Sequence, residues 1–274
     1  MSEYEAFGRM ERSNWSQSTK VLNYVNLFSS VTDQTIDSIL ETIIIENSHK
    51  ALDVCCGQGT LSAALKAKGY AVSGLDFSPA MLEMARQRVP EVNFVDGDAQ
   101  NLPFSDNQFD VVVSNLGICH VPNQPRALSE VHRTLHAGGK FAMTVWCGPD
   151  ISPCFELFYG AVKAFGNPDA SAPSGPDFHQ FSKLEIARKL FLEAGFTEIH
   201  FSVIECSLNS DNPEQLCEIF EKATVRGSML LASQPPECLD SIRMALASAV
   251  QERFRSGERW CVPMPAAMIS ACKL

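Results

Sequence analysis

The spacing of hydrophobic positions along the chain changes near residue 50. Before this point, apolar side chains recur at helical intervals over residues 21–28 and again over residues 36–43. After it, short apolar runs alternate with helical stretches. Residues 1–46 are therefore predicted to be helical, and we interpret them as an N-terminal helical lid.

The short apolar runs predict seven strands, at residues 51–55, 71–76, 92–95, 109–114, 141–146, 197–206 and 266–271. Helical patterns lie between them at residues 61–68, 79–88, 126–135, 155–165 and 184–194, and two more fall within residues 213–255. Such alternation requires right-handed crossovers and a sheet covered on both faces. We predict an α/β fold with a doubly wound, mostly parallel seven-stranded sheet, N-terminal helices and a helical cap insertion.

Composition and charge narrow the class of protein. The 274 residues include 22 Lys and Arg against 32 Asp and Glu, which gives a net charge of −10. Nucleic-acid binding begins with clustered positive charge, so we expect no nucleic-acid partner. No apolar run approaches the ~20 residues that span a bilayer, and the acidic N-terminus is unlike a signal peptide. We expect a cytoplasmic protein with no membrane span.

Ten cysteines are spread through apolar segments of the chain. Cys55 and Cys56 are adjacent and no CxxC pair occurs, which argues against zinc-ribbon and thioredoxin motifs. We expect most of these thiols to be buried and no metal ion to be bound.

A glycine turn, Gly57-Gln58-Gly59, follows the first predicted strand and opens a helix. Glycines at such a turn let the backbone approach a ligand, and the helix N-terminus offers free N–H groups. Asp76 lies 19 residues beyond Gly57, where a ribose-binding acid is expected. These features fit NAD and S-adenosylmethionine equally well.

Three further features separate the two ligands. Asp53 interrupts the apolar strand before the turn, which is costly unless its carboxylate is hydrogen-bonded. Gly97-Asp98-Ala99 follows the third strand, and Leu102-Pro103-Phe104 leads into the fourth. The combination resembles the class I S-adenosylmethionine-dependent methyltransferases, of the small-molecule type similar to the ubiquinone/menaquinone biosynthesis methyltransferases. The matching segments are residues 52–60, 74–78, 97–99, 102–104, 135–140 and 194–196.

The resemblance implies a division of the chain and a cofactor. Residues 1–46 would form the lid, residues 47–206 a Rossmann-like core that binds S-adenosylmethionine, and residues 207–274 a helical cap insertion with the final strand of the same domain. One departure is Cys55, which stands where the family usually has its first glycine. We expect a slightly tighter cofactor turn there and a site that is retained.

The resemblance also implies roles for residues around the turn. Asp53 would organise the turn near the amino-acid part of the cofactor, while Gly57 and Gly59 would allow close backbone approach. Asp76 would accept both ribose hydroxyls, and Phe77 would pack on the adenine face.

Further along the chain, Asp98 would accept a hydrogen bond from the adenine amine, and the N–H of Ala99 would donate to the ring. Asn115 and Leu116, at the end of the fourth strand, would flank the methionyl group.

Two histidines are candidates on the acceptor side. His120, just past the fourth strand, would be the base where the acceptor must lose a proton, or else a residue that ties down its loop. His179 falls in a Gly- and Pro-rich stretch, residues 148–182, and is expected on a surface loop.

The resemblance implies in-line methyl transfer as the function. Aromatic residues cluster in the suspected lids, so we expect the acceptor to be a small, fairly apolar organic molecule. One alternative is an NAD-dependent oxidoreductase, although the sequence shows no clear set of catalytic residues for hydride transfer. Another is a non-catalytic or repurposed S-adenosylmethionine-binding protein. Nothing in the pattern indicates an oligomeric state.

Overall fold

The computed structural model describes residues 4–44, 50–167, 170 and 174–274. Its centre is a seven-stranded sheet in the order β3-β2-β1-β4-β5-β10-β6, and β10 runs antiparallel to both of its neighbours. The strands are β1 (Lys50–Val54), β2 (Ala71–Asp76), β3 (Asn93–Asp96), β4 (Phe109–Asn115), β5 (Leu135–Trp146), β6 (Thr197–Ile204) and β10 (Ala266–Cys272). The other pairings in this sheet are parallel. The predicted fold class is therefore confirmed.

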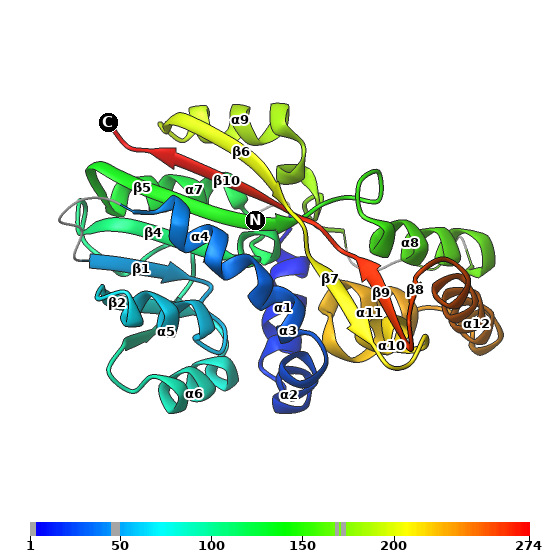
Figure 1. The fold of residues 1–274 in the computed structure, drawn as a ribbon. Helices are drawn as coiled ribbons and strands as arrows, with labels where there is room; N and C mark the ends of the chain where they lie inside the picture. The colour runs from blue at the N-terminus through cyan, green and yellow to red at the C-terminus, as the bar shows by residue number, and fades with distance from the viewer. Residues whose placement is uncertain (1–3, 45–49, 168–169, 171–173) are drawn as a thin grey trace.

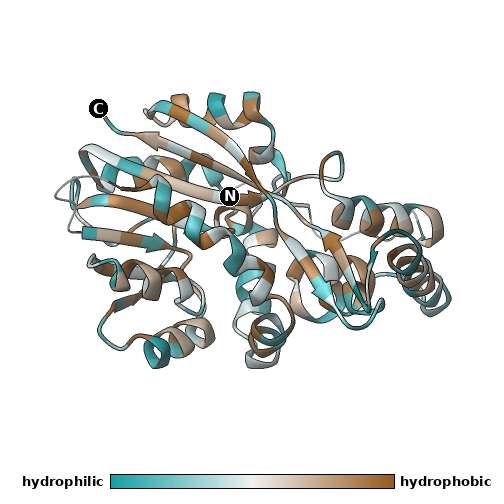
Figure 2. Ribbon diagram, in the orientation of Figure 1, coloured by the Kyte–Doolittle hydropathy of each residue, from teal (hydrophilic) through white to brown (hydrophobic). Residues whose placement is uncertain are grey.

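Alternate residues along each strand enter alternate cores, as the two-residue period of a strand requires. On β4, Val112 faces α7 (Gln124–Thr134) and α9 (Leu184–Glu193) on one side of the sheet. Val111 and Val113 face α4 (Ile36–Thr42), α5 (Thr60–Ala67) and α6 (Pro79–Arg88) on the other. In Figure 2 the strands carry much of the hydrophobic colour, and the helices alternate hydrophobic and hydrophilic residues. The sheet is thus covered on both faces.

Residues 4–44, the described part of the N-terminal segment, are largely helical, as the periodicity predicts; residues 1–3, 45 and 46 of the predicted lid lie outside the described residues. The segment comprises α1 (Glu5–Trp15), α2 (Ser18–Leu27), α3 (Ser29–Thr32), the turn η1 (Asp33–Thr35) and α4. In Figure 1 the helices α1 to α3 lie below the sheet and beside the C-terminal helices. The N-terminal helices and the cap therefore meet near one end of the strands.

Residues 207–263, called the cap below, differ from the helical insertion that the sequence predicts. Their helices are α10 (Gln215–Glu218), η4 (Ile219–Ala223), α11 (Val225–Ala232) and α12 (Pro236–Arg253), and α8 (Pro153–Phe165) packs against α12. The cap also holds a small antiparallel sheet in the order β7-β9-β8. Its strands are β7 (Ser207–Ser210), β8 (Arg255–Ser256) and β9 (Arg259–Pro263). β7 and β9 continue the line of β6 and β10 out of the main sheet (Figure 1).

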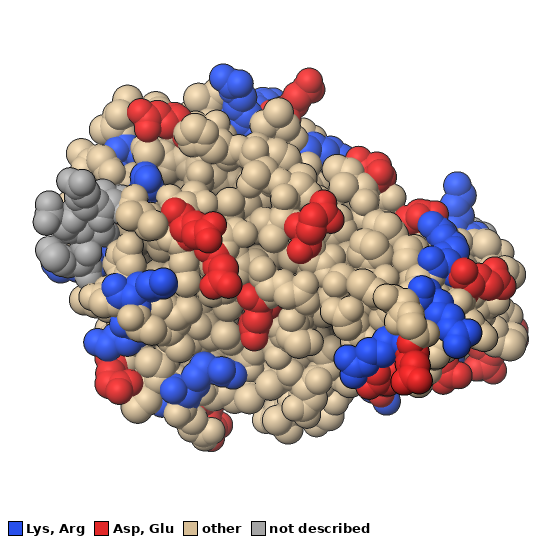
Figure 3. Space-filling model, in the orientation of Figure 1, with Lys and Arg blue, Asp and Glu red and all other residues tan. Residues whose placement is uncertain are grey.

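Two general features of the surface bear on function. On the face shown in Figure 3, acidic and basic side chains are interspersed and form no basic stripe. Within the described part of the chain, no helix has the length and hydropathy to cross a bilayer.

Candidate active site

Two neighbouring cavities open at the carboxyl ends of β1, β2 and β4, where ligands bind in doubly wound sheets. The first has a volume of about 310 Å³ and the second about 240 Å³. Both are lined by Cys55, Asp76, Phe77 and His120, so the two cavities meet at these four residues. Every site residue that the sequence predicts lines one of the cavities, with the exception of Gly59.

The turn after β1 is held in a left-handed backbone conformation. Cys55 has φ +60° and Gly57 has φ +53°, and the Gly57 N–H donates to Oδ2 of Asp76 at 2.9 Å. A non-glycine residue in this region costs roughly 1–2 kcal/mol, which explains why a glycine suits position 55. Gly117 makes room for the cysteine, because a Cβ on Gly117 would lie 2.3 Å from Cβ of Cys55.

Gly59 differs from the expectation of close approach to a ligand. A Cβ on Gly59 would lie 3.0 Å from Cβ of Ala85 on α6 and 3.2 Å from the ring of Phe94. The absent side chain therefore makes room for α6 and β3, and it does not open a ligand cavity. A Cβ on Gly57 would meet no atom nearer than Sδ of Met81 at 3.9 Å. Gly57 is thus the glycine that borders open space.

Asp53 is a buried carboxyl that accepts a hydrogen bond from a neighbouring serine. Its side chain is 1 % exposed, and Oγ of Ser62 donates to its Oδ2 at 2.6 Å. Burial raises the pKa of Asp53 to about 7, against the hydrogen bond from Ser62, which lowers it. The carboxyl can therefore change charge near neutral pH.

Asp76 occupies the junction of the two cavities. Each of its oxygens accepts a backbone N–H at 2.9 Å, one from Gly57 and one from Ser78. Burial raises its pKa, while these backbone bonds act in the opposite direction. The Phe77 backbone bond acts in the same direction, and because a carboxylate has about four lone-pair sites, accepting capacity remains beyond these three bonds. Beside it, the Arg12 guanidinium lies 5.2 Å from the ring centroid of Phe77.

The second cavity continues past Asp76 under α1. Asp98 and Ala99 line it from the loop after β3, opposite residues of the first helix such as Arg9. Oδ1 of Asp98 accepts the Gln100 N–H at 2.9 Å, which fixes the carboxylate. The structure thus brings the acids at positions 76 and 98 to one continuous space.

Asn115 and Leu116 line the first cavity at the end of β4. The Asn115 side chain accepts from Oγ1 of Thr35 at 2.7 Å and donates to the Thr32 carbonyl at 3.1 Å. Thr144 on β5 also donates to Asn115 Oδ1. Asn115 therefore joins the N-terminal helices to the sheet, a role that the sequence did not predict.

His120 lies in the turn η2 (Ile118–His120) and pairs with a buried acid. Its Nδ1 is 3.0 Å from Oε2 of Glu11, a residue of α1 that is 1 % exposed. Trp15 Nε1 donates to the same oxygen at 3.1 Å. Burial acts to lower the pKa of His120, but Cys119 and Glu11 outweigh burial and raise the pKa to about 10.

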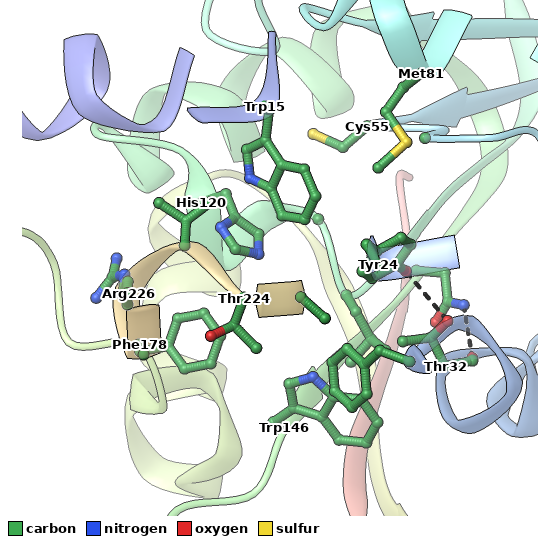
Figure 4. A pocket seen from close by; sticks show the side chains of 18 of the residues that line it. Trp15, Tyr24, Thr32, Cys55, Met81, His120, Trp146, Phe178, Thr224 and Arg226 are labelled. Carbon is green, nitrogen blue, oxygen red and sulfur yellow. Dashed lines mark hydrogen bonds between the residues drawn. The ribbon is translucent and has the colours of Figure 1, made fainter. Parts of the chain in front are cut away.

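Arg226 of α11 completes this cluster from the cap. Its Nε is 3.7 Å from Oε1 of Glu11, and neither buried atom has a hydrogen-bond partner among the described residues. Its terminal nitrogens donate to the carbonyls of Cys119 at 3.1 Å and Pro176 at 2.7 Å. In Figure 4, Arg226, His120 and Phe178 lie together on one side of the pocket. Glu11 and Arg226 carry no sequence signal, because the three charges come from segments far apart in the chain.

The remainder of the first cavity is walled by rings, and we call this part the aromatic chamber. It is formed by Phe28, Trp146, Phe155, Phe158, Tyr159, Phe178 and Phe220. Phe158 and Phe220 stack with centroids 3.8 Å apart, which joins α8 to the cap. Behind this wall lies His179, which is 6 % exposed. The expectation that His179 sits on a surface loop is wrong, because its ring packs between Phe155 and Phe178.

Comparisons with known proteins agree with this geometry. A family model described as a methyltransferase domain matches residues 52–143. The demethylmenaquinone methyltransferase of Staphylococcus epidermidis is 36% identical over 178 residues, covering 59% of this chain and 73% of the relative. That of Lactiplantibacillus plantarum is 32% identical over 177 residues, covering 58% and 74%.

A solved structure shares the fold. Phosphoethanolamine N-methyltransferase 2 of Haemonchus contortus, in complex with S-adenosyl-L-methionine, superposes with a TM-score of 0.61 at 19% identity, over 97% of this chain and 60% of that one. These matches favour S-adenosylmethionine over NAD, the other ligand that the glycine turn allows. The chain belongs to the class I S-adenosylmethionine-dependent methyltransferases, similar to the ubiquinone/menaquinone biosynthesis enzymes, and S-adenosylmethionine is its methyl donor.

Proposed function

We propose that this enzyme transfers the methyl group in line to a small, fairly apolar organic acceptor. The observation that carries the proposal is the continuity of the first cavity. Its lining runs from Asp53 and Gly57 at one end to the aromatic chamber at the other. Apolar walls with few polar groups are typical of sites for small organic ligands.

The proposed cofactor site uses the two acids at the cavity junction and beyond it. Asp76 would accept hydrogen bonds from the ribose hydroxyls, and Asp98 and Ala99 would hold the adenine in the second cavity. Asp53 and Gly57 would border the amino-acid end, with Cys55, Leu116 and Phe77 supplying contact. What supports this fit is that Asp76, which is buried, lines both cavities, and that Asp98 lines the second of them.

Bound S-adenosylmethionine supplies a methyl group already activated on a sulfonium. The protein then contributes by aligning the acceptor and excluding water. The rings of the aromatic chamber would hold a flat apolar acceptor, and α1 and α11 would close over it. Residues 1–46 serve in this proposal as the lid, residues 47–206 as the cofactor-binding core, and residues 207–274 as the cap with the last strand.

In this proposal His120 does not act as a base. A group whose pKa is raised to about 10 keeps its proton at neutral pH and so cannot accept another. We assign His120 as a positioning residue that links its loop to Glu11. Any proton that the methyl acceptor releases must then pass to a group other than His120.

Transfer of a labelled methyl group tests the proposal. Purified enzyme with methyl-labelled S-adenosylmethionine is given demethylmenaquinone, simple phenols and indoles, and in parallel glycine and phosphoethanolamine. Label is expected in apolar aromatic products, with inversion of a chirally labelled methyl group. Transfer confined to the polar acceptors, or retention of configuration, would overturn it.

The cofactor half is tested separately with Asp76→Ala. Two buried ligand hydroxyls would lose their acceptor, which costs on the order of 2–4 kcal/mol. S-adenosylhomocysteine should bind roughly 30- to 1000-fold more weakly by calorimetry. An unchanged affinity, with only a small loss of stability, would remove Asp76 from the site.

A further inference from the structure

Tyr159 and His179 form a hydrogen-bonded pair at the wall of the aromatic chamber. Tyr159 lies on α8 and lines the cavity, while His179 immediately precedes the turn η3 (Gln180–Ser182). The Tyr159 hydroxyl is 3.2 Å from Nε2 of His179. The imidazole ring lies 4.5 Å from that of Phe155 and 5.0 Å from that of Phe178, centroid to centroid. The pair is therefore held in place by the rings that line the chamber.

The second nitrogen of His179 fixes the direction of this hydrogen bond. Nδ1 is 3.1 Å from the backbone carbonyl of Trp146, which can only accept, so Nδ1 carries the proton. Burial lowers the pKa of His179, and nearby Arg226 lowers it further, against the carbonyl bond and the carboxylates of Asp177 and Asp150. The ring is thus neutral at pH 7, and Nε2 has only a lone pair to offer.

Tyr159 must therefore donate its proton to His179. Burial raises the pKa of Tyr159 to about 12, so the phenol stays protonated at neutral pH. With its proton engaged, the phenol oxygen has only lone pairs left for a ligand. Tyr159 itself lines the cavity, in a wall otherwise dominated by phenylalanine and tryptophan rings.

From this arrangement we propose that Tyr159 selects acceptors by accepting a hydrogen bond from them, with His179 as the positioning residue that keeps it in the accepting state. The substrate class is an apolar aromatic compound that carries a hydroxyl or N–H donor. This inference rests on the proposed function, because it places the acceptor in the aromatic chamber. An acceptor-only group, such as an ether, would gain nothing at Tyr159.

A second tyrosine provides the internal comparison. Tyr24 also lines the cavity and donates to Oγ1 of Thr32 at 3.1 Å. Its ring lies 5.4 Å from that of Trp15, on the N-terminal helices. Tyr24 belongs to α2 and its ring lies 6.0 Å from that of Phe28, so its hydroxyl is held by a different element from that of Tyr159. A Tyr→Phe substitution at either position removes one hydroxyl from a cavity-lining residue. Only the Tyr159 hydroxyl is expected to accept a hydrogen bond from the methyl acceptor.

The test uses two probes of nearly equal shape, 2-naphthol and 2-methylnaphthalene. Their dissociation constants are measured by equilibrium dialysis with saturating S-adenosylhomocysteine, for wild type, Tyr159→Phe and Tyr24→Phe. The ratio of the two constants cancels general hydrophobicity. Tyr159→Phe should lower the preference for the naphthol by about 3- to 10-fold, the range of one neutral hydrogen bond. Tyr24→Phe should leave that preference within twofold.

Each outcome has a distinct meaning. An unchanged naphthol preference in Tyr159→Phe, with both probes bound, overturns the inference and leaves the proposed function intact. Loss of the preference in Tyr24→Phe alone also overturns it. Failure of wild type to bind either probe, while S-adenosylhomocysteine binds normally, removes the aromatic acceptor site and the inference with it.

Variants of His179 separate positioning from a purely structural role. In His179→Gln the side-chain carbonyl can still accept the Tyr159 proton, so the naphthol preference should be retained. In His179→Leu that proton is free, and the acceptor-only probe 2-methoxynaphthalene should bind about 3- to 10-fold more tightly than to wild type. Equal weakening of all probes in both variants would show a structural role alone and contradict the positioning assignment.

Discussion

Gly57 and Gly59 lie two residues apart in one turn, but Gly57 borders the cofactor cavity and Gly59 packs against the protein core. A Cβ at residue 57 would enter open space beside the cofactor cavity, whereas one at residue 59 would crowd Ala85 and Phe94. Their substitutions should therefore separate ligand binding from stability.

We predict opposite effects for the two alanine variants. Gly57→Ala should weaken S-adenosylhomocysteine binding by about tenfold or more and cost roughly 1–2 kcal/mol of stability from its φ of +53°. Gly59→Ala adds crowding to its φ of +78° and should cost about 2–4 kcal/mol, with near-normal affinity in the folded fraction. Calorimetry and urea unfolding measure both quantities. The reverse pattern would assign the ligand contact to Gly59.

Asp53 gives a pH-dependent prediction. Its pKa is raised from 3.8 to about 7 on folding, so the folded state binds the extra proton and stability falls as pH rises between about 4 and 7. Asp53→Asn cannot ionise and should raise the free energy of unfolding at pH 8 by about 2–4 kcal/mol, with little change near pH 4.

Urea unfolding without ligand at the two pH values checks this. Asp37→Asn, at an exposed position on α4, is the matched control. Its effect on the free energy of unfolding should be the same at pH 4 and pH 8. An equal gain for Asp53→Asn at pH 4 and pH 8 would mean that the buried carboxyl is not the source.

Residue roles could be predicted from sequence where one position violates its local pattern. Asp53 stands out because a carboxyl interrupts an apolar strand, and Asp76 because it ends one. Glu11 and Arg226 violate nothing, since each is an ordinary polar position on a helix. Their meeting with His120 depends on packing between segments more than 100 residues apart, and a local pattern holds no information about it.

At the scale of elements, one buried carboxylate joins three segments. Glu11 of α1 faces His120 of η2 and Arg226 of α11, so the N-terminal helices and the cap are linked through the loop after β4. Buried charges stabilise an arrangement only as long as their partners remain. The cluster therefore makes α1 and α11 depend on each other.

We predict strong coupling between Glu11 and Arg226. Glu11→Leu leaves two cations without their counter-charge and should cost about 3–5 kcal/mol. The double variant Glu11→Leu/Arg226→Met should lose less free energy of unfolding than the sum of the losses in the two single variants. The expected coupling energy, measured by urea unfolding, is roughly 1–3 kcal/mol. Strictly additive losses would show that the two side chains are energetically independent.

Element boundaries were predictable where capping and periodicity agree. The structure places α6 over Pro79–Arg88, as predicted, because Ser78 caps the Met81 N–H and a proline follows it. The small β7-β9-β8 sheet was missed. Its first strand is short and largely polar, and it pairs with residues some 50 positions later, so neither alternation nor a hairpin turn marks it.

At the scale of the whole molecule, ligand binding should be felt on both sides of the cavity. Residues of α1 and of α11 line it, whereas none of α12 does. A ligand that contacts both sides suppresses their local opening. S-adenosylhomocysteine should therefore slow amide hydrogen exchange in α1 and α11 by at least several-fold and leave the internal control α12 unchanged. Protection confined to the β1–α5 turn would contradict a shared closure.

The position of β10 has a consequence for synthesis of the protein. This strand lies between β5 and β6 and pairs with both, yet it follows the whole cap in the chain. Until residues 266–272 leave the ribosome, β6 has no neighbour in the sheet and β5 keeps an open edge. Unpaired edges are templates for pairing with other chains. The nascent chain therefore carries these unpaired strand edges throughout the translation of residues 205–265, which exposes it to aggregation during that interval.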